Sequence, residues 1–337
     1  MLLYIMRLAR FHNWKRKAIS PPHALSFTMS SPRALTGAAF ATLLLIALMM
    51  GGNHVAARLA FNNGVDVATA VVFRSVVSAL FLFALLRVQR VPLGFATLST
   101  RQKRMLPLVG LLIGFQSLSI YSSVARLPVA LALLAFNTYP LCAAFWDRVL
   151  YGKKPERAML IAMPVILVGL ALALDVFGAA SGLGASAQWA QIGVGVAFAV
   201  LAALLFGLAM ILTQHEITSL DGRVRTFTTL STAGLVAIVS AALHGGLQLP
   251  SGPGPSIALG WVGLGMLTLL YGTAFTIMFT VLPKLGVAGN SAIMNVEPVF
   301  ALALAWLILE QAIAPIQVGG ALIVVAAVIV LGLRRGK

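Results

Sequence analysis

The stretch 125–140 reads ARLPVALALLAFNTYP, and the stretch 283–298 reads PKLGVAGNSAIMNVEP. Aligned at an offset of 158 residues, the two stretches are identical at five of 16 positions. The identical pairs are Leu127 and Leu285, Val129 and Val287, Ala130 and Ala288, Asn137 and Asn295, and Pro140 and Pro298. Both copies also carry a basic residue near their start and Asn-x-x-Pro within an apolar segment. The chain is therefore predicted to contain an internal repeat.

The composition of the whole chain is that of a membrane protein. Of its 337 residues, 60% are hydrophobic and only 9% are charged, whereas a soluble domain carries about 25% charged residues. Ten apolar runs are close to the length of about 20 residues that a helix needs to cross a bilayer. These runs are 35–61, 66–86, 105–126, 128–150, 157–177, 190–214, 226–244, 257–282, 286–309 and 314–333. We expect an all-α integral membrane protein with ten transmembrane helices.

The repeat assigns five of these helices to each half of the chain. Because five is odd, the second copy enters the membrane upside down relative to the first. Two inverted five-helix repeats are typical of secondary transporters, in which the substrate path lies at the interface of the copies. We place the repeats at 35–180 and 188–334, after a basic cytosolic tail at 1–34. For that tail two interpretations stay open: a segment that touches anionic lipid, or translation that starts at Met29.

The distribution of basic residues predicts the orientation in the membrane. The net charge of +16 comes from 24 Lys and Arg against eight Asp and Glu. With the N-terminus in the cytoplasm, 21 of the basic residues fall on the cytoplasmic side, Arg58 and Arg126 fall outside, and Arg74 lies within a helix. This asymmetry predicts a multi-pass protein with cytoplasmic N- and C-termini. Since the charges occupy short loops that set topology, nucleic acid is not expected as a partner.

Several functional classes lack their sequence signatures. The chain has no Walker-type phosphate-binding loop, so a nucleotide-driven pump is not expected. His-Glu-x-x-His and Gly-x-Ser-x-Gly motifs are also missing, and the eight acidic residues are scattered. The single cysteine, Cys142, excludes an internal disulfide and a multi-cysteine metal site. We expect neither an enzyme nor a metal site or cofactor.

Both copies of the fourth-helix motif resemble the drug/metabolite transporter superfamily, and within it the ten-helix EamA family. The first copy is Leu134-Ala-Phe-Asn-Thr-Tyr-Pro140, followed by Tyr151-Gly-Lys-Lys-Pro155. The second copy is Asn295-Val-Glu-Pro-Val-Phe-Ala301, which ends at Leu309-Glu310. Phe73-Arg74 is similar to the Phe-Arg of the family's second helix. The resemblance covers about residues 35–334, nearly the whole chain except the tail.

The chain also departs from the family pattern in two places. Gly51-Gly52 stands where the family commonly has Trp-Gly, and Gly152 stands where the first repeat commonly has an acidic residue. The resemblance implies a secondary transporter, often an exporter of amino acids or other metabolites, in a bacterial-type inner (plasma) membrane. The Glu297-Pro298 pair is similar to that of the family's amino-acid exporters.

We therefore expect a secondary active transporter that exports amino acids or related small metabolites by alternating access. The alternatives are an exporter of drugs or other small metabolites, and, from a different class, a channel or a non-transporting membrane protein. A membrane enzyme that acts on a lipid-linked substrate is disfavoured, because the loops are short and poor in acids and histidines. The expected partners are a small-molecule substrate and the lipid bilayer. Protons as the coupling ion, and a monomer against a homodimer, stay open.

Charged and titratable residues inside the apolar runs are the first candidate site residues, because a charge at the bilayer centre costs about 2.5–3.5 kcal/mol. Glu297 lies near the midplane, where it could carry a proton or bind an amine, or else cap backbone donors near Pro298 or pair with a cation. Arg74 could hold a substrate carboxylate by a forked contact, or bond to carbonyls or to Glu297. His54, beside Asn53, could titrate near neutral pH, or be a hydrogen-bonded interior histidine.

The fourth and ninth helices are the predicted pore-lining pair. Pro140 and Pro298 each break the helix hydrogen-bond pattern and free a carbonyl at matched positions in the two halves. The polar candidates on these two helices are Asn137, Tyr139, Asn290 and Asn295. A second group of candidates lies on the third and eighth helices, namely Gln116, Tyr121 and Tyr271.

Two further patterns predict local contacts. Asp147 and Arg148, near the cytoplasmic end of the fourth helix, are expected to form an interfacial pair whose side chains reach toward the headgroups. Gly110-x-x-x-Gly114 is expected to allow close helix packing.

Overall fold

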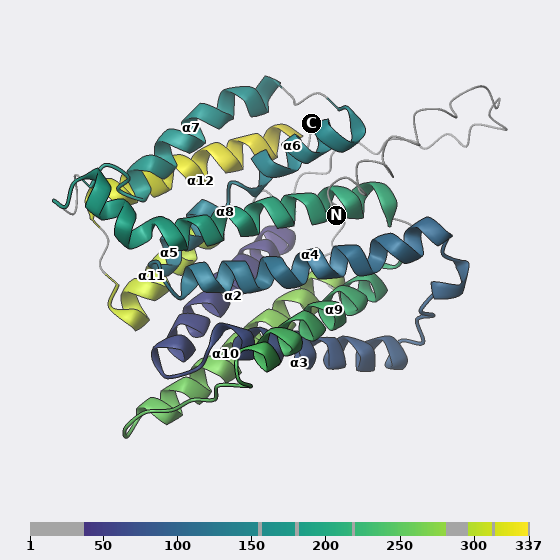
Figure 1. The fold of residues 1–337 in the computed structure, drawn as a ribbon. Coiled ribbons are helices and arrows are strands. Elements are labelled where there is room, and N and C mark those ends of the chain that lie inside the picture. Colours follow the sequence, from purple (N-terminus) through teal and green to yellow (C-terminus); the bar gives the residue numbers. More distant parts are fainter. Residues whose placement is uncertain are drawn as a thin grey trace.

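The computed structural model describes residues 37–153, 157–178, 182–217, 220–280, 296–311 and 314–335. Every regular element in these residues is a helix (Figure 1). The elements are α2 (Gly37–Asn62), α3 (Val67–Val88), the 3-10 turn η2 (Phe95–Thr97), α4 (Thr100–Val124), α5 (Val129–Phe136), α6 (Tyr139–Tyr151), α7 (Arg157–Ala173), α8 (Ala185–Glu216), α9 (Gly222–Leu243), α10 (Ser256–Thr280), α11 (Glu297–Leu309) and α12 (Pro315–Arg335). The predicted tail at 1–34 lies outside the described residues.

The helices match the predicted membrane segments. Among the described residues, seven spans are long and apolar enough to cross a bilayer, and α5 and α6 together make one of them. Three shorter apolar helices lie at 160–173, 297–309 and 315–327. The seven and the three correspond to the ten predicted segments, so the all-α membrane fold is confirmed. The proposed limits of the repeats, 35–180 and 188–334, stay a prediction.

The fourth membrane segment is broken in the middle. Helix α5 ends at Phe136, where the Asn137 N–H still donates to the Leu133 carbonyl at 2.8 Å. Helix α6 begins at Tyr139, after two intervening residues, with Pro140 in its first turn. A proline in the first turn needs no hydrogen-bond partner for its nitrogen. In the second repeat α11 likewise starts with Pro298 in its first turn.

Each repeat packs chiefly against the other. The 158-residue offset maps α2 onto α8, α3 onto α9, α4 onto α10, and α7 onto α12. The most extensive contacts are those of α10 with α2 and of α4 with α8, and the offset exchanges these two pairs. The next pairs, α12 with α7 and α3 with α9, map onto themselves. This is the pattern of two inverted copies that interlock about a pseudo-twofold axis.

Small residues set the closest approaches between helices. A Cβ at Gly110 would lie 2.6 Å from Thr232 Cβ, and one at Gly114 would lie 2.9 Å from Val236 Cβ. Helix α4 therefore packs directly on α9, as the Gly-x-x-x-Gly pattern predicted. A Cβ at Gly51 would lie 3.0 Å from the Glu297 carbonyl oxygen. The glycine in α2 thus lets α11 begin directly against it.

The two ends of the bundle differ in chemistry. The start of α4 and the ends of α6 and α8 carry charged residues and form what we name the charged end, on the right of Figure 1. Trp189, Trp261 and Trp306 are 42%, 45% and 67% exposed and lie near the opposite helix ends. Exposed tryptophans at one level are typical of a membrane interface.

Candidate functional site

A cluster of polar side chains lies inside the bundle, between helices of both repeats. We name it the interior cluster. Its members are Asn53 and His54 of α2, Arg74 of α3, Ser117 and Tyr121 of α4, Tyr271 of α10, and Glu297 of α11. Arg74 is 3% exposed, Tyr121 0%, and His54 and Tyr271 6% each. Among the described residues the cluster thus combines an arginine, a carboxyl group and a histidine within an apolar interior.

Arg74 has aromatic and hydroxyl neighbours instead of a carboxylate. Its Nη2 donates to Ser117 Oγ at 2.7 Å, and its Cζ lies 4.7 Å from the ring centre of Tyr121 and 4.1 Å from that of Tyr271. Among the described residues no Asp or Glu oxygen lies within 4.0 Å of its guanidinium. Its Nε makes no hydrogen bond. Cation–π contacts stabilise a desolvated guanidinium by about 2 kcal/mol but leave its charge unneutralised.

Glu297 pairs with His54 across the two repeats. The distance from His54 Nδ1 to Glu297 Oε1 is 3.3 Å, and the same nitrogen lies 2.9 Å from the Met50 carbonyl oxygen. Glu297 Oε1 is buried and makes no hydrogen bond, so the two side chains lie in contact without a hydrogen bond between them. Glu297 is also the first residue of α11, where the positive end of the helix dipole favours a carboxylate. The pair therefore brings an imidazole from one repeat and a carboxyl group from the other side by side in the interior cluster.

Tyr121 connects the two charged parts of the cluster. Its hydroxyl donates to Asn53 Oδ1 at 2.7 Å, and its ring meets the His54 ring edge-on with centres 5.6 Å apart. The face of the same ring lies against Arg74. The Arg74 side and the Glu297–His54 side of the cluster are thus separated by one aromatic ring.

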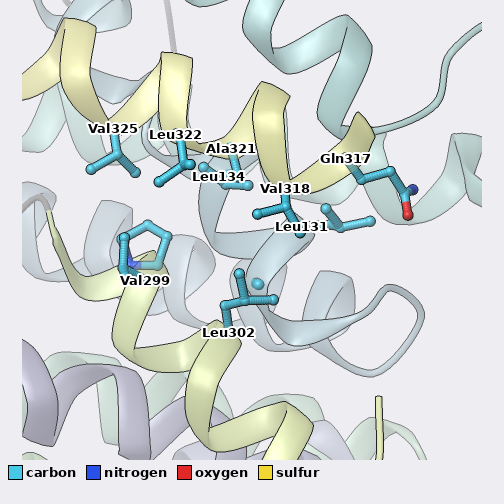
Figure 2. A pocket seen from close by; sticks show the side chains of 11 residues that line it. Leu131, Leu134, Val299, Leu302, Gln317, Val318, Ala321, Leu322 and Val325 are labelled. Carbon is cyan, nitrogen blue, oxygen red and sulfur yellow. The ribbon is translucent and has the colours of Figure 1, made fainter. Parts of the chain in front are cut away.

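An apolar cavity lies next to α11 but outside the interior cluster. It is lined by α5, α11 and α12, and Figure 2 shows Leu131, Leu302 and Val318 facing one another across it. Its volume is about 30 Å³, which is room for little more than a water molecule. Gln317 lies at its edge and accepts a hydrogen bond from the Ala314 N–H at 3.0 Å. The cavity is therefore too small and too apolar to hold a polar metabolite.

The charged end holds a second polar network, and it is fully paired. Arg101 binds both oxygens of Glu216 through Nε and Nη2 at 2.6 and 2.7 Å, and the Tyr151 hydroxyl donates to Glu216 at 2.7 Å. His215 Nε2 lies 3.0 Å from Asp147 Oδ1, and its ring stacks on Tyr151 with centres 3.9 Å apart. This network joins α4 and α6 of the first repeat to α8 of the second.

The predicted pair of Asp147 with Arg148 does not form. Asp147 faces His215, with Lys153 Nζ 3.9 Å from its second oxygen, whereas Arg148 donates to the Gly152 carbonyl at 3.1 Å. Neighbouring residues on a helix point about 100° apart, so Arg148 points away from Asp147. His215 of α8 contacts the Asp147 carboxylate instead. Nearby, side-chain hydrogen bonds from Arg223 lower the pKa of Asp221.

The structure brings together part of the predicted site. Asn53, His54, Arg74, Tyr121, Tyr271 and Glu297 belong to the interior cluster, and Gln116 adjoins it through Ser117 at 3.5 Å. Asn137 and Tyr139 lie elsewhere, at the break between α5 and α6. Tyr139 packs on Phe206 of α8 with ring centres 5.0 Å apart. Asn290 and Asn295 lie outside the described residues.

Sequence reasoning missed the serines of the site. Ser75 and Ser78 on α3 and Ser117 on α4 are 0%, 1% and 2% exposed. The signal was present, since residues three and four apart share a helix face and Ser78 is four residues from Arg74. A serine hydroxyl can hydrogen-bond to a carbonyl of its own helix, so a single serine in an apolar run does not by itself predict a binding site.

Comparison with known proteins adds the family. The sequence model of the EamA-like transporter family matches residues 37–174 and 193–333, one match in each half. The chain belongs to the EamA-like transporter family. As a family member within the drug/metabolite transporter superfamily, it is a multi-pass membrane transporter built from two repeats. The two matched segments contain every described residue of the interior cluster.

This EamA-family chain is also similar to a solved structure. A solved structure titled only "Crystal structure of protein" is similar over 88% of this chain and 98% of its own, with a TM-score of 0.55 and 17% identity. At that identity the likeness supports the shared fold alone. No curated protein matches the chain.

Proposed function

We propose that this chain is a secondary active transporter that exports amino acids or related small metabolites by alternating access. The observation that carries the proposal is the interior cluster, because both repeats contribute to it. Arg74 and Tyr121 come from the first repeat, and Tyr271 and Glu297 come from the second. A site shared by two inverted halves is exposed to one side or the other when the halves rock.

The closed cluster is the occluded arrangement in this proposal. Contacts between the two repeats lie at both ends of the bundle, Arg101 with Glu216 at the charged end and the Val129 N–H with Gln311 Oε1, 3.2 Å, at the other. Parting of the repeats at one end opens a route to the cluster from that side. The cluster then exchanges solute with the cytoplasm or with the exterior, one at a time.

Glu297 and His54 supply the coupling to protons in this proposal. A proton on Glu297 removes its negative charge and weakens its attraction to His54 Nδ1, now 3.3 Å away. Because the two residues come from different repeats, this change loosens one contact between the halves. A pH gradient can therefore drive the exchange of states, and protons are the proposed coupling ion.

Orientation follows from charge in the same proposal. The charged end faces the cytoplasm of a bacterial-type inner membrane and both termini are cytoplasmic, in accord with the excess of Lys and Arg in the segments at that end. Solute then leaves the cell by binding from the charged end and being released at the tryptophan-bearing end.

The test is efflux of a panel of labelled amino acids from proteoliposomes, with and without a pH gradient. Wild type should give saturable flux that the gradient accelerates, and Glu297→Gln should lose that acceleration. Glu310→Gln is the matched control, because Glu310 is an exposed acid that follows the other end of α11. Gradient-driven flux that survives in Glu297→Gln would contradict the coupling. Flux that does not saturate would indicate a channel instead.

A further inference from the structure

We propose that Arg74 is the binding site for the carboxylate of the transported solute, and that the solute itself is the missing counter-charge of this arginine. The inference rests on the proposed transport function and names the chemical class of its substrate. It starts from a charge that the fold buries without neutralising. A buried ion without a partner costs several kcal/mol, so a ligand that supplies the opposite charge gains that energy back on binding.

The acidic residues of the chain do not supply this charge. Six of the eight lie at or within about a turn of a helix end, namely Asp66, Asp147, Asp175, Glu216, Asp221 and Glu310. Glu297 lies in the interior, but it faces His54 and forms no ion pair with Arg74. The eighth, Glu156, lies outside the described residues. Within the described part of the chain, Arg74 is therefore a buried cation without an anion.

Hydrogen-bond donors left over around Arg74 are those that a carboxylate would use. Arg74 Nε, Ser75 Oγ and Ser78 Oγ are all buried and make no hydrogen bond. Ser75 and Ser78 are three residues apart on α3, and Ser78 follows Arg74 by one helical turn. Unpaired buried polar groups are rare in folded proteins and call for a specific explanation. One carboxylate, with about four acceptor positions on its two oxygens, could accept from Arg74 Nε and Ser78 Oγ, which share a face of α3, whereas Ser75 lies against Gly234 of α9.

The two tyrosines tie this site to the relative position of the repeats. Tyr121 lies on α4 of the first repeat and Tyr271 on α10 of the second, and the guanidinium is held between them at 4.7 and 4.1 Å. Next to Tyr271, Gly272 keeps space beside α3, since a Cβ there would lie 3.2 Å from Ser78 Oγ. A shift of α10 along α3 would uncover the guanidinium and the Ser78 hydroxyl together.

The charge of the site favours a monoanion. Arg74 is the only Lys or Arg in the interior cluster, and its neighbours are hydroxyls and aromatic rings. A phosphate would bring close to two negative charges to one cation in an apolar interior, which leaves a net charge buried. A carboxylate leaves none. The amine of an amino acid would carry its own positive charge toward the Glu297 side of the cluster.

The experiment compares matched solutes that differ only in the carboxylate. Efflux from proteoliposomes is measured for an apolar amino acid, its amide and its decarboxylated amine, in wild type, Arg74→Gln and Ser78→Ala. Wild type should transport the amino acid at least tenfold faster than the amide or the amine. Arg74→Gln should lose at least about 100-fold for the amino acid only, and Ser78→Ala about tenfold, as expected for charge-assisted hydrogen bonds.

Each result decides between separate claims. Wild type that carries amines or amides as fast as amino acids overturns the carboxylate site but leaves the transport function standing. Equal losses for all three solutes in Arg74→Gln, or no loss in a folded Ser78→Ala, also overturn it. No saturable flux of any solute by wild type overturns the proposed function and this assignment with it. Size-exclusion elution and circular dichroism of each variant show that it is folded.

Discussion

Arg74 and Arg101 are the same residue type in two different settings. Arg101, at the charged end, binds both oxygens of Glu216 at 2.6 and 2.7 Å and has a side chain that is 35% exposed. Arg74, in the interior, is 3% exposed and has one serine and two tyrosine rings in place of a carboxylate. Arg101 with its carboxylate thus holds α4 to α8, whereas Arg74 has no carboxylate partner among the described residues, which is why we propose that a ligand supplies one.

The largest effect is expected in transport. Arg74→Gln should lower kcat/KM for a carboxylate solute at least about 100-fold, which corresponds to about 2.7 kcal/mol at 1.36 kcal/mol per tenfold. Arg101→Gln should lower it less than tenfold, because Arg101 does not belong to the interior cluster. Initial rates of efflux over a range of internal solute concentrations measure both values. Equal losses in the two variants would remove the functional distinction between the two arginines.

The next largest effect is expected in the free energy of unfolding, and it concerns Arg101 instead of Arg74. Arg101→Met leaves Glu216, whose side chain is 8% exposed, without its cation and should lower the free energy of unfolding by about 2 kcal/mol. The double variant Arg101→Met/Glu216→Met should recover most of this loss, since no charge is then left unpaired. Thermal unfolding in detergent of wild type, the two single variants and the double variant measures these differences in stability. A double variant as unstable as Arg101→Met alone, or less stable, would contradict the explanation.

A third prediction tests the packing of α4 against α9, which joins the two repeats. Gly110→Val should cost about 1–3 kcal/mol by overpacking, since even a Cβ at this position would lie 2.6 Å from Thr232 Cβ. Gly265→Ala on α10 is the matched control, because nothing lies within 4 Å of its Cβ position. The control should be neutral or gain up to about 1 kcal/mol from helix propensity. A Gly110→Val protein as stable as wild type would show that α4 and α9 are not in close contact.

The smallest effect is expected at Asp221, an exposed acid paired with Arg223 at 2.9 Å. Asp221→Asn keeps a helix-capping side chain but removes the charge, and should cost about 0.5 kcal/mol. The pair lowers the pKa of Asp221, so its contribution is complete above the unfolded pKa of about 3.9. It is lost only as the pH falls through the lower folded pKa. A wild-type-minus-variant difference that changes between about pH 5 and 8 would contradict this assignment.

Apolar runs, basic loops and the Asn-x-x-Pro repeat predicted the fold well. The apolar length of a segment and the charge of its flanking loops decide whether and in which direction it crosses the membrane, and both can be read locally from the sequence. The partners inside the bundle could not be read in the same way. Helices that are apolar on all sides show no periodic face that marks their neighbours. The sequence allows Glu297 several partners, Arg74 among them, and only the packing of α11 against Gly51 places it at His54.

Tyr139 and Glu297 occupy corresponding positions in the two repeats. The 158-residue offset superposes the two positions, and the structure places Tyr139 against α8 as it places Glu297 against α2. The partners differ, because Leu212 and Thr232 occupy the positions that correspond to His54 and Arg74. The backbone is thus repeated, but the charged residues of the interior cluster have no counterparts at the corresponding positions of the other repeat. A motif shared by both halves predicts shape, and the residues around it decide where the charges lie.

The most direct test of the central claim is thermal unfolding of wild type and Arg74→Met side by side, without solute and with a saturating transported amino acid. If Arg74 is an uncompensated charge kept for a carboxylate, the variant without solute should be at least as stable as wild type. The amino acid should raise the melting temperature of wild type only. A variant that is about 3 kcal/mol less stable without solute, or that the amino acid stabilises as much as wild type, would make Arg74 a structural residue and contradict the account.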